Sequence, residues 1–153
     1  MKMKRYVNVI VFFMSFVFLT GISLPQEDKL INKLDNRNHR NPTKVIFDQV
    51  EAGISDGDVG MISKYFGSQT YLSLSNGKSG YYSSNQAFYV LEDFFKIYRV
   101  ASFRLNNINT DENTPYATGV YNFEFKGKKN VAQVYISLKK AGSGWKITQI
   151  TIN

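Results

Sequence analysis

The sequence predicts an α+β domain in which a curved antiparallel sheet packs on three helices. Two observations carry this prediction. Residues 116–152 contain three strand-like runs separated by glycine-containing turns, and residues 42–98 contain three stretches with apolar side chains at helical spacing. The expected order of elements is helix, helix, strand, strand, helix and then four strands.

Alternation of side chains defines the strands of the last third. One face of the run after residue 130 carries an apolar set, Ala132, Val134, Ile136 and Leu138. Residues 116–125 alternate in the same way, and residues 145–152 are apolar or threonine at almost every position, which is typical of a central strand. The segments 126–129 and 139–144 contain glycine and are expected to be hairpin links.

Two helices are expected at the start of the domain. Asn41 or Thr43 can cap the first, Pro42 suits its first turn, and its apolar side chains recur at helical spacing: Ile46, Phe47, Val50 and Ile54. Gly57 can close this helix, and Asp58 can cap a second one. The second helix is expected to bury Val59, Ile62 and Phe66 and to end at Gly67.

A hairpin and the longest helix occupy the middle of the chain. Asn76-Gly77 predicts a tight turn between strands at residues 70–75 and 78–82. Ser83 and Gln86 form a capping box that opens a helix with a wide apolar stripe, Ala87, Phe88, Leu91, Phe94, Phe95 and Tyr98. The run 101–106 predicts a further strand, with a bulge near Ile108.

The chain divides into three predicted segments. Residues 1–23 have a basic start, an apolar run and small residues before Leu24, which is typical of a signal peptide; an uncleaved anchor is the alternative. Residues 24–42 are a polar linker expected to be disordered, and residues 43–153 are the domain. We therefore expect an exported protein, periplasmic or extracellular, without stable membrane insertion after cleavage.

Charge and composition argue against several classes of function. The net charge is +7, but residues 45–153 hold eleven basic and nine acidic side chains scattered over the chain, so no nucleic acid partner is expected. The absence of cysteine excludes disulfides, thiolate metal sites and cysteine nucleophiles. The single histidine, His39, lies in the linker, and Asp56-Gly57-Asp58 lacks the later ligands of a calcium loop. No metal and no cofactor are predicted.

The order of elements, the Gly57-Asp58 pair and the run 144–147 resemble the nuclear transport factor 2-like superfamily over residues 43–153, most closely its small secreted bacterial domains of unassigned function. The resemblance implies a cone, in which a strongly bent antiparallel sheet wraps around three helices and leaves a pocket at its open end. Some members are enzymes that use an acid or base in the pocket, and others bind or assemble. No catalytic residue can be transferred here, because His39 precedes the domain and Glu124 falls on the face opposite Tyr121.

Ten tyrosines are the compositional peculiarity of the chain. The residues predicted to line an aromatic pocket are Phe47, Tyr65, Tyr82, Phe95, Tyr98, Tyr121 and Tyr135. Asp48 and Glu51, one helical turn apart, are the alternative acid and base candidates, although a solvated helix face is the favoured explanation for both.

Three functional hypotheses follow. The first is a non-enzymatic exported domain that binds a small apolar or amphipathic ligand, or a partner protein, in an aromatic pocket. The second is a small-molecule enzyme of the isomerase, dehydratase or hydrolase type, with Asp48 or Glu51 as base and a tyrosine as polariser. The third is an assembly module that forms a homodimer through the outer face of the sheet, with Tyr116, Val120 and Tyr135.

Overall fold

The computed structural model describes residues 41–153. The predicted signal peptide, and the predicted linker up to residue 40, lie outside the described residues. Within residues 41–153, no helix combines the length and the apolar character needed to cross a membrane.

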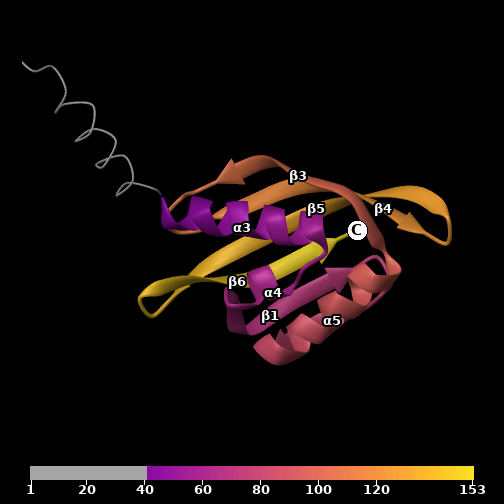
Figure 1. Ribbon diagram of the computed structural model, residues 1–153. Coiled ribbons are helices and arrows are strands. Elements are labelled where there is room, and N and C mark those ends of the chain that lie inside the picture. Colours follow the sequence, from indigo (N-terminus) through magenta and orange to yellow (C-terminus); the bar gives the residue numbers. More distant parts are fainter. Residues whose placement is uncertain (1–40) are drawn as a thin grey trace, which may run out of the picture. The chain divides into compact units, whose positions relative to one another are not determined.

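Six strands form one curled sheet, which confirms the predicted fold class and element order (Figure 1). Its strands lie in the order β2-β1-β6-β5-β4-β3. Their bounds are β1 Phe66–Leu74, β2 Ser79–Ser83, β3 Arg99–Asn109, β4 Tyr116–Phe125, β5 Lys128–Ala141 and β6 Gly144–Ile152. The last strand, β6, lies between β1 and β5, as its apolar sequence predicts for a central position.

One strand pair differs from the predicted antiparallel sheet, because β1 and β6 run parallel. The helix between β2 and β3 carries the chain back, so β3 starts in the same direction as β2. The three hairpins that follow then give β6 the direction of β1. The sheet is therefore mixed, and its other described pairs are antiparallel.

Three helices lie along the chain as predicted: α3 Pro42–Asp56, α4 Gly60–Ser63 and α5 Ser84–Ile97. The Asn41 side chain accepts a hydrogen bond from the Thr43 N–H at 3.0 Å, and Gly57 closes α3 at φ 67°. The capping box of Ser83 and Gln86 opens α5, which was expected to be the longest helix but has 14 residues against the 15 of α3. The second helix is shorter than predicted, because Phe66 and Gly67 already belong to β1.

The core fills the space between the sheet and the helices. In Figure 1, α3 and α5 lie on the same side of the sheet, α3 against β3 and α5 against β1 and β2. The apolar residues predicted for α3 are buried there, and so is the alternating inner set of β5. Both helices thus bury one stripe, which leaves the opposite face of the sheet to solvent.

The last two hairpins have tighter turns than predicted. Strand β4 ends at Phe125 and β5 begins at Lys128, so two residues, Lys126 and Gly127, make the turn with φ of 51° and 73°. Such a pair of positive φ values suits the twist of a hairpin. In β3 the register shifts between Leu105 and Asn107, which confirms the predicted irregularity close to Ile108.

Candidate functional site

The concave side of the sheet is occupied by an aromatic cluster that joins α5 to β3 and β4. We define this aromatic cluster as Phe94, Phe95, Tyr98, Phe103, Tyr121, Phe123 and Phe125. Tyr98 is stacked between two of its members, with ring centroids 4.6 Å from both Phe94 and Phe125. These rings pack against one another as core side chains do, where the sequence predicted a hollow.

Tyr121 is the centre of the aromatic cluster. Its ring is fully buried, and its hydroxyl donates a hydrogen bond to the backbone carbonyl of Tyr98. Burial raises the pKa of the Tyr121 phenol above its ordinary value, because an anion there would lose its hydration. The phenol is therefore a neutral donor that ties β4 to the end of α5.

The seven aromatic residues predicted to share one pocket are not brought together. Phe47 of α3 is fully buried, and Phe95, Tyr98 and Tyr121 belong to the aromatic cluster. Tyr82 is half-buried on the edge strand β2. The two that remain lie elsewhere: Tyr65 lines a surface groove described below, and Tyr135 lies on the outer face of the sheet.

Tyr135 takes the outer face because of strand parity. It alternates with the buried residues Val134 and Ile136 of β5, so its side chain points away from the core. Its ring stacks on that of Tyr116 at 5.8 Å between centroids. Whether this face pairs two copies of the chain stays a prediction, which light scattering at high protein concentration tests.

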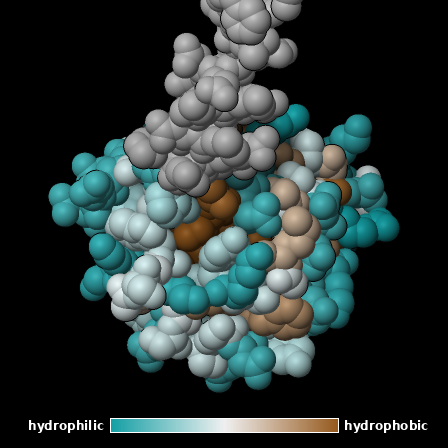
Figure 2. Space-filling view, turned by 60° about the vertical axis from the view of Figure 1, so that its left-hand side comes forward, coloured by the Kyte–Doolittle hydropathy of each residue, from teal (hydrophilic) through white to brown (hydrophobic). Residues whose placement is uncertain are grey.

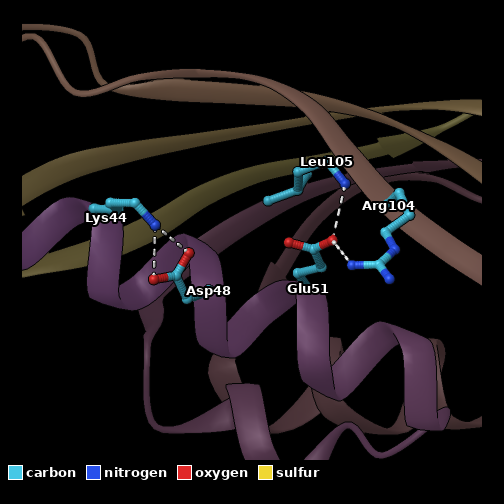
Figure 3. Close-up of polar contacts among 5 residues, drawn as sticks. All are labelled: Lys44, Asp48, Glu51, Arg104 and Leu105. Carbon is cyan, nitrogen blue, oxygen red and sulfur yellow. Dashed lines mark hydrogen bonds and ion pairs between the residues drawn. The ribbon is translucent and has the colours of Figure 1, made fainter.

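The two carboxylates predicted as acid and base candidates lie on α3, facing β3 (Figure 3). Asp48 is exposed and forms an ion pair with Lys44 at 2.8 Å. Glu51 accepts a hydrogen bond from the Leu105 N–H at 3.3 Å, and the same oxygen lies 3.8 Å from the Arg104 guanidinium. Both carboxylates are thus engaged by neighbours of their own domain.

The position of Glu51 explains its contact with β3. Because β3 is the last strand of the sheet, one of its edges has no strand partner among residues 41–153. Side chains of α3 take that place: Glu51 accepts from the Leu105 N–H, and the Ser55 hydroxyl donates to the Phe103 carbonyl at 3.1 Å. Edge strands that are covered in this way do not recruit other strands. Glu51 therefore has a structural task.

The Asp48 and Glu51 side chains also line a groove of about 580 Å³ between α3 and β3. An enzyme built on this groove would need a group that polarises the substrate, and the hypothesis assigned that role to a tyrosine. Of the described residues that line the groove, none is a tyrosine. The groove therefore holds both candidate carboxylates without the tyrosine that the hypothesis requires among its described lining residues.

A larger groove of about 830 Å³ lies where the start of α3, the segment before β1 and the β5–β6 hairpin meet. We call it the Trp145 groove. Its apolar lining comes from Val45 and Ile46 of α3, from Tyr65 and from Trp145 of β6. The remaining lining residues are Pro42, Lys64, Lys140, Ser143, Gly144 and Lys146. Its volume falls within the range of small-molecule sites.

The Trp145 groove is cationic at its rim. Lys64, Lys140 and Lys146 contribute three ammonium groups, and no carboxylate is among the described residues that line it. The Lys146 ammonium donates to the Lys64 carbonyl at 2.8 Å, and the Lys64 ammonium lies 5.0 Å from the centre of the Tyr65 ring. Within residues 41–153, all four ion pairs are made by other basic side chains.

Figure 2 turns this end of the domain toward the viewer. A recessed area of strongly hydrophobic residues, drawn in brown, is bordered there by pale and hydrophilic residues. An apolar floor with a polar border is the usual composition of a site for an amphipathic molecule.

The sequence prediction named one residue of this groove, Tyr65, and did not name Trp145 or the three lysines. Lys140, Trp145 and Lys146 were assigned to a charged hairpin link and the start of a strand. Strand β5 continues to Ala141, and the register pairs Lys140 with Trp145 across the hairpin. The signal available in the sequence was the chain's single tryptophan beside a glycine-containing turn that lysines flank.

Comparisons with known proteins agree with this fold. The family model for a domain of unknown function, DUF4783, matches residues 47–153. A comparison with curated proteins gave no match. A DUF4783 family protein from Bacteroides uniformis has a structure with a TM-score of 0.63 at 22% identity, over 69% of this chain and 94% of that chain.

Two further structures are similar at lower identity. A ketosteroid isomerase-like protein from Erwinia carotovora atroseptica gives a TM-score of 0.59 at 10% identity, covering 72% of this chain and 92% of that chain. A protein of ketosteroid isomerase-like fold from Catenulispora acidiphila, in complex with trimethylamine, gives a TM-score of 0.57 at 12% identity, covering 71% of this chain and 83% of that chain. At these identities the likeness shows the fold alone. Because the family model spans most of the described domain, the chain belongs to the DUF4783 family and has the nuclear transport factor 2-like fold that its sequence resembles.

Proposed function

We propose that this protein is a non-enzymatic, exported binding module that holds a small amphipathic molecule in the Trp145 groove. The observation that carries the proposal is the lining of that groove, where two aromatic rings and two aliphatic side chains meet at a cationic rim. Small-molecule sites combine an apolar lining with a few polar groups in this way.

The groove is built from segments far apart in the sequence. Residues 42–46, 64–65 and 140–146 reach it from three different elements. The segment from α4 to β1 is held by a backbone hydrogen bond of 2.7 Å from the Ile147 N–H to the Tyr65 carbonyl, which fixes Tyr65 beside β6. A site that is already formed in the free protein costs less ordering when a ligand binds.

Binding fits the residues better than catalysis does. Asp48 and Glu51 are held by Lys44, Arg104 and the β3 backbone, and both lie in a different groove from Tyr65 and Trp145. The fold leaves the question open, since it hosts ketosteroid isomerase-like proteins and a protein solved with trimethylamine. The local chemistry favours a binding module.

Export is supported by the composition of residues 1–23. A mature chain starting near Leu24 would present the groove to the periplasm or to the outside of the cell. Measuring the intact mass of the exported protein tests this part of the proposal. A chain that still contains Met1 to Ser23 would contradict it.

Binding is tested with a panel of small apolar and amphipathic molecules. The chain has one tryptophan, so the fluorescence of Trp145 reports on the groove directly. We expect a saturable change, which Tyr65→Ala weakens at least fivefold. Tyr81→Ala is the matched control, because Tyr81 lies on β2 and is 73% exposed. A signal that no compound changes, or equal effects of the two substitutions, would overturn the proposal.

A further inference from the structure

From the rim of the Trp145 groove we infer that its ligand is an amphipathic anion, a molecule with an apolar chain or ring and a carboxylate or phosphate head. This inference rests on the proposed function and specifies the chemistry of the bound molecule. The apolar part lies against Tyr65 and Trp145, and the head is held by Lys64, Lys140 and Lys146.

The first step of the argument concerns charge. Lys64, Lys140 and Lys146 approach the groove from the segment before β1, from β5 and from β6. None of them forms an ion pair with a carboxylate of residues 41–153. Three like charges around one groove repel one another, and an anion between them relieves that repulsion.

The second step concerns the pairs that the domain does form. Lys44, Lys96, Arg99 and Arg104 each have a carboxylate within 4 Å. Four of the domain's carboxylates thus form ion pairs away from the Trp145 groove. The domain's other five lysines also form no ion pair within residues 41–153, but none of them lines the groove. The cations that remain around the Trp145 groove match a negative charge from outside the domain.

The third step concerns the shape of the ligand. Ile46 is 6% exposed, and Trp145 and Val45 are half-buried, so the floor of the groove offers apolar surface of limited width. A bare inorganic anion would leave this apolar surface exposed to water. A molecule that covers the floor and also carries the charge satisfies both parts of the groove.

The test uses the full chain and three molecules with alkyl tails of nine or ten carbons, each below its aggregation threshold: decanoate, decanol and decyltrimethylammonium. Trp145 fluorescence and calorimetry measure the affinity. We expect decanoate to bind at least tenfold more tightly than decanol, and the cationic molecule to bind most weakly. Raising the salt concentration should weaken the binding of decanoate and leave the binding of decanol unchanged, because only the anion interacts with the charges of the lysines.

Substitutions identify the groups that select the anion. Lys140→Gln should lower the decanoate affinity about threefold. The triple change of Lys64, Lys140 and Lys146 to glutamine should lower it at least tenfold, and both variants should bind decanol as the unchanged protein does. Lys78→Gln is the matched control, because Lys78 lies in the turn at the far end of β1. Far-ultraviolet circular dichroism confirms that each variant is folded, and Lys140→Gln alone serves if the triple variant is not.

Decyl phosphate and vesicles of anionic phospholipid distinguish the sources of the charged head. Tight binding of decanoate or decyl phosphate supports a soluble ligand, whereas binding to vesicles alone overturns it in favour of a membrane surface. If decanol binds as tightly as decanoate, the proposed binding function stands and the selection of an anion is wrong. If no amphiphile changes the fluorescence or gives heat, the proposed function itself fails.

Discussion

Removal of the Glu51 carboxylate separates its structural task from a catalytic one. Glu51 accepts a hydrogen bond from the Leu105 N–H on the edge strand β3, and 24% of its side chain is exposed. Glu51→Ala leaves this partly buried N–H without its acceptor, which costs about 1–3 kcal/mol of unfolding free energy. The ion pair with Arg104 adds less than about 1 kcal/mol, because the Arg104 side chain is 88% exposed.

Glu51→Gln keeps a carbonyl oxygen at the same position and loses the charge. We expect it to cost less than about 1 kcal/mol, so the two substitutions differ although both remove a carboxylate. The matched control is Asp48→Ala, whose carboxylate is exposed and pairs with Lys44 on the same helix, and which should cost at most about 0.5 kcal/mol.

Urea unfolding followed by circular dichroism measures all three variants, with the midpoint shifting and the slope unchanged. The capping of the β3 edge by Glu51 is refuted if Glu51→Ala is no more destabilising than Asp48→Ala. It is also refuted if Glu51→Gln is as destabilising as Glu51→Ala, because the charge and not the acceptor would then matter.

Three further outcomes follow from the fold. Gly119→Ala should cost about 1–3 kcal/mol, because the new Cβ would lie 2.5 Å from the Arg104 carbonyl oxygen, whereas Gly144→Ala has open space and should be near neutral in urea unfolding. Asn41→Ala removes the cap of α3 and should lower the unfolding free energy by about 1 kcal/mol; an unchanged midpoint would contradict this. Burial raises the folded-state pKa of Tyr121 above its ordinary value of 10.0, so the stability that the neutral phenol contributes is complete below pH 10 and is lost as the pH rises further. Tyr121→Phe should therefore flatten the alkaline decline of the unfolding free energy. Parallel pH profiles of the two proteins would refute this expectation.

Local signals in the sequence predicted the elements well. The capping box of Ser83 and Gln86 and the cap at Asn41 act between residues two or three positions apart, so the sequence alone contains their geometry. Strand alternation likewise placed Ala132 to Leu138 on the core face, because parity is a property of a single strand.

Non-local pairing could not be predicted in the same way. The second helix ends early because the Ile147 N–H bonds to the Tyr65 carbonyl, a partner 82 residues away in the sequence, and Phe66 then enters the sheet beside β6. The parallel pairing of β1 with β6 likewise joins segments that lie far apart in the sequence. Tertiary contacts override helix propensity at such positions.

The predicted site residues lie apart in the structure for a related reason. Aromatic residues were expected to line a hollow, but the sheet packs Tyr121 of β4 against Phe94 and Phe95 of α5, so the rings fill the concave side. Ring packing of this kind stabilises a core by burial and by ring contacts together. An abundance of aromatic residues therefore did not distinguish a pocket from a packed interior.

The same packing explains why a binding site at the end of the sheet suits this chain. Residues of the aromatic cluster cannot open toward a ligand without giving up the contacts that join α5 to β3 and β4, and core truncations of large rings cost several kcal/mol. Tyr65 and Trp145 are only half-buried, so a ligand can cover them without displacing the core. A ligand in the Trp145 groove would bury the exposed parts of these two rings, and the aromatic cluster would keep all of its contacts.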